Sequence, residues 1–292
     1  MSRLQKSNPM SDLKFIAEIG SNWWKKSNDD GLKRARHLIS EAKGVGAHIV
    51  KFQIFTANTL YSKERAPELY ARARLYELPT SWLSDLRSHA NFCGIEFWAS
   101  VFDPEIAWGY CSYLQGIKIA SGDLTYDVLV AEAAKISAKC KYPLAISTGA
   151  GTEEEIGHAL DVAHSHSPHQ VILFHCNSTY PAKQEGMNLR AGLIFRDRVD
   201  AIGLSDHTLD SVSCCMAVGV GYTYFEKHFR GYQVEDTPDA PISLMPNEFR
   251  NLITDVRHAE TILGEPKKRV FASEVGERKW ARRGEDGLRP RI

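Results

Sequence analysis

Short apolar segments rich in β-branched and aromatic residues recur along the whole chain of 292 residues. Most of them lack a strict alternation of apolar and polar positions. That pattern is typical of strands in a parallel sheet that is buried on both faces. We therefore predict eight strands, at residues 14–20, 48–53, 96–102, 116–121, 143–149, 171–176, 201–207 and 223–229.

Helical patterns lie between these strands. The segment at residues 30–46 places apolar side chains on one stripe and then reaches Gly44 and Gly46, as a helix C-terminus does. Thr152 precedes a second helical pattern, with Glu155 three residues later, which predicts a capping box. The sequence "DSVSCCMAVGVG" predicts a helix between the last two strands.

Eight strand–helix units predict an α/β fold, a (β/α)₈ TIM barrel formed by a single domain at residues 14–270. Residues 1–13 are then an N-terminal extension and residues 271–292 a C-terminal tail. The alternative is an open doubly wound sheet, which usually carries a glycine-rich phosphate loop after its first strand. Here the first strand is followed by "EIGSNWWKKS", without G-x-G-x-x-G, so the barrel is favoured.

Composition narrows the class of function. Lys plus Arg equals Asp plus Glu, so no basic field indicates a nucleic-acid partner. No apolar run approaches the roughly 20 residues that span a bilayer, so we expect no membrane partner. The first residues have no apolar stretch of a secretory signal, and the six cysteines form no C-x-x-C pair. We therefore expect a cytoplasmic protein with reduced thiols.

Polar residues gather where the predicted strands end, which is where a barrel places its chemistry. The segments "AIGLSDH" and "TYFEKHF" both end in a histidine, His207 and His228. Two imidazoles on neighbouring strands can hold a divalent metal, although a single histidine there is more often structural. Lys118 lies inside the apolar run "GIKIAS", and a buried lysine is costly unless it meets an anion.

Three lysines and several hydroxyls at these strand ends suit a phosphate or a carboxylate ligand. Glu18 could complete a metal shell or move a proton. Each feature also has a simpler explanation, because Lys51 could be solvated at the rim, and Ser147 and Ser205 could cap the following helices. Trp23 and Trp24 follow the first strand, where they could wall the mouth of the barrel.

Seven motifs in order, "IAEIGSN", "VKFQ", "KIASGD", "ISTGAG", "HCNSTYPA", "GLSDHT" and "FEKHF", resemble the sialic acid synthase (N-acetylneuraminate synthase) family. The resemblance extends from about residue 14 to residue 284. It implies a barrel enzyme, a transferase that condenses phosphoenolpyruvate with an aldose such as N-acetylmannosamine. The product is a 2-keto-3-deoxy sugar acid, and phosphate is released. A divalent metal takes part, manganese by expectation, with magnesium and cobalt as alternatives.

The resemblance also assigns roles to residues of this chain. Glu18, His207 and His228 are the catalytic residues, and the two histidines bind the metal. The residues for phosphoenolpyruvate are Lys51, Ser100, Lys118, Ser121, Ser147, Asn177 and Ser205. The residues for the acceptor sugar are Asn22, Gln53, Tyr180 and Asp239.

The departures from the family pattern fall on the acceptor side. Trp23 occupies a position where the family has a histidine, and Ala240 replaces a second histidine after Asp239. The resemblance further implies that the C-terminal antifreeze-like domain of many members is absent, since the chain ends shortly after "ERKWARRG". We therefore expect the reaction type to be retained and the acceptor to differ. Members are commonly dimers, so a homodimer is expected as well.

Two other functions remain open from the sequence. One is a synthase of octulosonate or heptulosonate phosphates, which needs a further basic site for a phosphorylated acceptor, such as Lys25, Lys26 and Lys63. The other is a non-catalytic barrel that binds a sugar, because a fold by itself does not guarantee activity.

Overall fold

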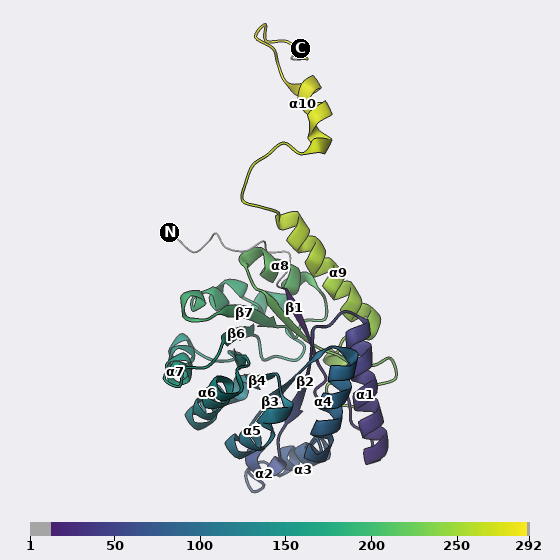
Figure 1. The fold of residues 1–292 in the computed structure, drawn as a ribbon, viewed down its shortest axis with the longest axis vertical. Helices are drawn as coiled ribbons and strands as arrows, with labels where there is room; N and C mark the ends of the chain where they lie inside the picture. Colours follow the sequence, from purple (N-terminus) through teal and green to yellow (C-terminus); the bar gives the residue numbers. More distant parts are fainter. Residues whose placement is uncertain (1–12, 291–292) are drawn as a thin grey trace. The chain divides into compact units, whose positions relative to one another are not determined.

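A closed barrel of eight parallel strands forms the centre of the computed structural model (Figure 1), which describes residues 13–290. Neighbours in the ring follow the chain order, and β8 pairs with β1 to close it. The strands are β1 Lys14–Glu18, β2 Ile49–Ile54, β3 Glu96–Val101, β4 Gly116–Ile119, β5 Leu144–Ser147, β6 Val171–Cys176, β7 Ala201–Ser205 and β8 Tyr224–His228. The predicted (β/α)₈ barrel is confirmed, and all eight predicted strands are present.

Helices α1 to α9 lie around the strands (Figure 1), and α10 follows in the C-terminal part of the chain. They are α1 Asn28–Gly44, α2 Ala57–Leu60, α3 Pro67–Leu75, α4 Leu83–Cys93, α5 Pro104–Tyr110, α6 Asp127–Cys140, α7 Glu153–His164, α8 Val212–Val220, α9 Pro246–Leu263 and α10 Val275–Ala281. The capping box at α7 is confirmed, because Thr152 Oγ1 accepts from the Glu155 N–H and Glu155 accepts from the Thr152 N–H.

The connection from β6 to β7 departs from the expected strand–helix repeat. It contains only short 3₁₀ turns, at Gln184–Gly186, Leu189–Leu193 and Arg196–Arg198. Pro181, Gly186, Asn188 and Gly192 interrupt this stretch, so no apolar stripe of helical spacing develops.

The chain divides into two compact units, residues 1–261 and 262–292. The first contains the barrel. The second contains a 3₁₀ turn at Ala272–Glu274 and α10, and its apolar side chains Phe271, Val275 and Trp280 are exposed. The N-terminal extension predicted at residues 1–13 lies, except for Leu13, outside the described residues. The predicted boundary at residue 270 stays a prediction.

Alternation along each strand separates two sets of side chains. One set, including Phe52, Phe97 and Leu204, belongs to the large core shared with the helices. The other set forms a separate apolar cluster, with Ile16, Ile49, Trp98, Ala145, Ile172 and Phe174 buried together. Since successive side chains of a strand point to opposite faces, this second cluster fills the inside of the barrel.

The inside cluster determines which polar residues reach the mouth. Two positions beyond Ile16, Ile49 and Trp98, on the same face of their strands, lie Glu18, Lys51 and Ser100. By the same alternation, Ser147 follows Ala145 and Cys176 follows Phe174. The polar end of the barrel interior therefore rests on a filled apolar layer.

Gly116 tests how tightly this layer is packed. A Cβ at this position would lie 2.3 Å from two atoms of the buried Trp98 ring, whereas nothing lies within 4 Å of a Cβ at Gly109 in α5. We expect Gly116→Ala to lower the free energy of unfolding by about 1–3 kcal/mol through overpacking. Gly109→Ala should be neutral, or stabilising by about 0.5–1 kcal/mol. Urea unfolding of both variants measures this, and equal effects would contradict the packing argument.

Candidate functional site

A cavity of about 480 Å³ opens at the carboxyl ends of the strands. Most of the predicted site residues line it, and they come from every strand or from the loop that follows it. The predicted residues in its wall are Glu18, Lys51, Gln53, Ser100, Lys118, Ser121, Ser147, Tyr180, Ser205, His207 and His228. The barrel therefore brings together side chains that are up to about two hundred residues apart in the sequence.

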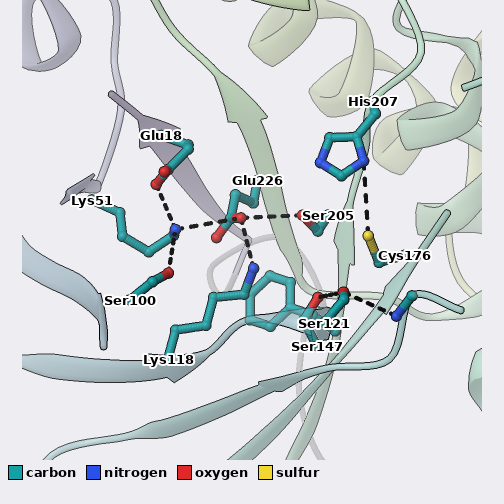
Figure 2. A network of polar contacts seen from close by, with 12 residues as sticks. Glu18, Lys51, Ser100, Lys118, Ser121, Ser147, Cys176, Ser205, His207 and Glu226 are labelled. Atoms are coloured by element: carbon teal, nitrogen blue, oxygen red, sulfur yellow. Dashed lines mark hydrogen bonds and ion pairs between the residues drawn. The ribbon is translucent and has the colours of Figure 1, made fainter. Parts of the chain in front are cut away.

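Four buried charged groups form the floor of this cavity (Figure 2). Lys51 Nζ lies 2.5 Å from Glu18 Oε2 and 3.7 Å from Glu226 Oε1. Lys118 Nζ donates to Glu226 Oε1 at 2.8 Å. The two cations thus share two carboxylates, and the cluster of four is formally neutral.

The buried lysines were expected to be compensated by an anionic ligand, and this pairing corrects that expectation. Their anions are supplied by the protein, because a carboxylate within a few ångströms offsets the cost of burying an ammonium group. Both lysines nevertheless line the cavity, so a bound phosphate or carboxylate would compete with Glu18 and Glu226 for them.

The charges in this cluster shift each other's proton affinity. Burial alone would raise the pKa of Glu226, but Lys118 and Lys51 outweigh it and lower that pKa to about 2. Burial alone would lower the pKa of Lys51, but Glu18 and Glu226 outweigh it and raise that pKa. Glu226 and Lys51 are therefore both ionised at neutral pH.

Hydroxyl groups surround the charges. Ser100 Oγ accepts from Lys51 Nζ at 2.9 Å, and Ser205 Oγ donates to Glu226 Oε1 at 3.1 Å. Ser121 Oγ donates to Ser147 Oγ at 3.1 Å and accepts from the Gly149 N–H at 3.0 Å. These contacts hold short hydrogen-bonding groups at the cavity wall, beside the two ammonium groups (Figure 2).

Lys227 does not join this group, which corrects the expectation that three lysines converge. Its Nζ lies 3.0 Å from Asp206 Oδ2 and also donates to the Thr208 hydroxyl at 3.3 Å. Lys227 is one residue out of phase with Glu226 and His228 on β8, so it points away from the cavity and lies outside its wall.

The two predicted metal-binding histidines lie side by side at the cavity, with ring centroids 5.6 Å apart. Nδ1 of His207 lies 2.7 Å from the Asn177 carbonyl oxygen, and the Tyr180 ring packs on His207 at 4.2 Å. His228 Nδ1 is buried with no hydrogen-bond partner. Burial lowers the pKa of His228, although Asp239 and Glu18 raise it, which favours the neutral imidazole that metals bind.

This donor set suits a divalent metal that takes its remaining ligands from water or substrate oxygens. Within residues 13–290 there is no group of three or more His, Cys, Asp or Glu side chains arranged as a metal site. The protein alone therefore offers two nitrogen ligands at this place.

Three predicted site residues lie outside this cavity wall. Asn22 is fully buried, and its amide donates to the Phe229 carbonyl and the Ser243 hydroxyl while it accepts from Thr237. It connects the first loop to the loop after β8, and its role in binding the acceptor sugar stays a prediction. The Asn177 side chain likewise donates to the Gly186 carbonyl, and it accepts from Thr179.

Asp239 lines a second cavity of about 420 Å³ and accepts from both the N–H and the hydroxyl of Ser21. This cavity adjoins the first, because Gln53, Phe102, Ala120 and Gly122 line both. Aromatic and aliphatic side chains dominate its wall: Phe55, Leu60, Tyr61, Leu69, Ala73, Tyr76 and Phe102. Most of them belong to a small hydrophobic cluster around α2 and α3 that is separate from the main core.

The expectation that Trp23 and Trp24 wall the mouth is wrong for both cavities. Trp23 is buried against Trp82 in an edge-to-face contact with centroids 5.4 Å apart, and neither tryptophan lines the two cavities. Lys25, Lys26 and Lys63 are also absent from both walls. Lys25 and Lys26 instead line a third cavity, together with Trp23, Trp24 and Arg74, so a second basic site for a phosphorylated acceptor stays a prediction.

Glu226 stands in the strand-end segment "TYFEKHF" but is not among the predicted site residues. A stricter use of alternation could have found it, because Glu226 lies two positions before His228 on the same face of β8. Cys176 also lines the cavity, 3.8 Å from His207 Nδ1. Burial alone would raise the pKa of Cys176, but the nearby His207 and Lys118 outweigh it and lower that pKa.

Comparison with known proteins agrees with this geometry. The family model described as the NeuB family matches residues 38–268, more than half of the chain. N,N'-diacetyllegionaminic acid synthase of Legionella pneumophila is 34% identical over 287 residues, covering 92% of this chain and 78% of that protein. The chain belongs to the NeuB family.

Other relatives agree with this NeuB assignment. Pseudaminic acid synthase of Campylobacter jejuni is 29% identical, covering 93% of this chain and 83% of that protein. The crystal structure of the N-acetylneuraminic acid synthetase of Leptospira borgpetersenii in complex with citrate superposes with a TM-score of 0.80 at 27% identity. That match covers 92% of this chain and 90% of the other. The resemblance inferred from the seven motifs is confirmed.

The relatives of this NeuB chain are sugar-acid synthases by name, which supports an enzymatic role in carbohydrate biosynthesis. In the part of the chain that the structure describes, every helix is too short or too polar to cross a membrane.

The buried charge cluster predicts a particular response to acid. Glu226 has a folded-state pKa of about 2 against an ordinary value of 4.5, so its ionisation contributes stability above about pH 4.5. That contribution is lost as the pH falls through about 2. We expect the free energy of unfolding of the unmodified protein to fall between these pH values by on the order of 3 kcal/mol more than that of Glu226→Gln.

Urea unfolding at a series of pH values measures this difference. The exposed Glu105→Gln is the matched control and should follow the unmodified protein. Parallel pH curves for Glu226→Gln and the unmodified protein would contradict the role given to Glu226.

Proposed function

We propose that this chain condenses phosphoenolpyruvate with an aldose to form a 2-keto-3-deoxy sugar acid and inorganic phosphate. One observation carries the proposal: Lys51, Lys118 and a ring of serine hydroxyls line the same cavity as the paired imidazoles of His207 and His228. Membership in a family whose named members make sialic, legionaminic and pseudaminic acids supports it.

The cations would hold the phosphate and carboxylate of phosphoenolpyruvate. Lys51 and Lys118 provide buried positive charge, and Ser100, Ser121, Ser147 and Ser205 provide hydroxyl donors. Glu226 is ionised and bonded to Lys118, so substrate must compete with it. When no substrate is bound, Glu226 thereby compensates the positive charge of Lys51 and Lys118.

A divalent metal on His207 and His228 would polarise the aldehyde oxygen of the acceptor, and manganese is the ion that we expect. Carbon 3 of phosphoenolpyruvate attacks the aldehyde carbon, and water adds at carbon 2. The tetrahedral intermediate then loses phosphate. Glu18 accepts from Gln53 Nε2 at 2.8 Å and faces the cavity, where it would transfer protons.

The second cavity would receive the part of the acceptor farthest from the new bond. It adjoins the first cavity at Gln53, and Asp239 lies in its wall. Its apolar side favours an acceptor with apolar substituents. The acceptor was expected to differ from N-acetylmannosamine, and the wall formed by α2 and α3 is where that selectivity would arise.

Phosphate release from phosphoenolpyruvate, measured across a panel of aldoses with manganese present, tests the proposed reaction. We expect His207→Gln to lower the rate at least about 100-fold, because one of two protein ligands of the metal is lost. His158→Gln is the control, since His158 is exposed and bonded to Asp127 on the outside of the barrel. Binding of phosphoenolpyruvate without turnover of any aldose would contradict the proposal and favour a non-catalytic barrel.

A pair of leucines on one helix tests the acceptor site. Leu69 and Leu75 are both exposed on α3, but only Leu69 lines the second cavity. We expect Leu69→Ser to raise the KM for the acceptor roughly threefold to tenfold and to leave the KM for phosphoenolpyruvate unchanged. Leu75→Ser should change neither constant. An equal effect of the two variants would place the acceptor elsewhere.

A further inference from the structure

A second buried ion pair lies on the opposite side of the barrel wall from the cavity. Lys227 Nζ and Asp206 Oδ2 are 3.0 Å apart, with 1% and 0% of the two side chains exposed. Neither residue lines either cavity, so the proposed reaction does not use their charges.

The pair organises the turn that follows β7. Lys227 Nζ donates to the carbonyl oxygen and the hydroxyl of Thr208. Asp206 accepts from the Thr208 N–H at 2.8 Å, from its hydroxyl at 3.1 Å and from Cys214 Sγ at 3.3 Å. Asp206 also donates its own N–H to the Glu226 carbonyl at 2.9 Å. Asp206 and Thr208 are thus both bonded to the ammonium group of Lys227 on β8.

The two members of this pair are direct sequence neighbours of the two histidines of the site. His207 lies between Asp206 and Thr208, and His228 follows Lys227. Each histidine is therefore joined by a peptide bond to a member of the network, while its imidazole faces the cavity. The Cα atom of each histidine is one residue away from the Cα atom of Asp206 or Lys227. If Asp206 and Lys227 move, the backbones of both histidines must therefore move with them.

A contribution to stability does not by itself explain why a buried ion pair is present at this place. A buried ion pair can often be replaced by apolar side chains of similar volume without loss of stability, because both charges must be stripped of water. The directional bonds from one ammonium to a side chain and a main-chain carbonyl do what an apolar contact cannot. They join the turn after β7 to β8 in a defined direction.

We propose that the Asp206–Lys227 pair is a positioning device that holds the imidazoles of His207 and His228 at metal-binding separation before any metal arrives. Its use in catalysis rests on the proposed function, but its effect on the geometry does not. In this structure the two rings lie 5.6 Å apart by their centroids, a separation at which we expect a nuclear Overhauser contact between ring protons.

The test compares the unmodified protein with Asp206→Asn/Lys227→Met, which removes both charges and keeps the approximate volumes. Ring-proton contacts between the histidines are recorded without metal, and Mn²⁺ affinity is measured by electron paramagnetic resonance. We expect the double variant to fold but to lose the His207–His228 contact and to bind Mn²⁺ about 10–100-fold more weakly. Arg257→Met is the matched control, because it removes the Arg257–Glu260 pair on α9 and should leave both readouts unchanged.

Each outcome decides the matter. If the double variant keeps both the ring contact and the Mn²⁺ affinity, the pair is structural only and the inference is wrong. The inference is also wrong if the unmodified protein shows no ring contact. If the unmodified protein shows the ring contact but does not bind Mn²⁺, the metal part of the proposed function is wrong. Loss of the ring contact in the double variant would still support the positioning role of the pair.

If the double variant does not fold, Asp206→Asn/Lys227→Gln decides instead, because it also removes both charges while its amides can still bond to Thr208. Loss of the ring contact in this folded variant supports the inference, and retention of the contact contradicts it.

Discussion

The structure depends on the compensation of charge inside the barrel mouth. Lys51 and Lys118 are almost fully buried, and they are tolerated because Glu18 and Glu226 lie within a few ångströms of them. This pairing makes a charge-compensated floor from residues that would otherwise be too costly to bury. It also places two cations where an anionic substrate can exchange with a carboxylate of the protein.

The barrel wall between β7 and β8 separates two charge networks with different surroundings. Inside it, Glu226 and Ser205 contribute to the cavity floor, and outside it, Asp206 pairs with Lys227. Adjacent residues serve opposite faces because side chains alternate along a strand. The same two strands therefore present cavity-lining groups on one face and a buried ion pair on the other.

The second cavity is built differently from the first. Lys51, Ser100 and Ser205 stand on strands, so the barrel itself determines their positions. The second cavity takes much of its wall from α2 and α3, which pack through a small cluster separate from the main core. A segment with its own packing can change without disturbing the barrel, which suits a family whose members are named for different sugar acids.

Periodicity and strand-end chemistry in the sequence were enough to predict the barrel, the polar mouth and the two neighbouring histidines. The seven motifs also predicted the family, because seven motifs in the same order along the chain are more specific than any single residue. The sequence could not tell that the lysines are compensated by Glu18 and Glu226, that Lys227 points away from the cavity, or that Trp23 packs against Trp82. Those outcomes depend on which side chains meet across strands far apart in the chain, and only the closed ring, with its alternation and register, decides that.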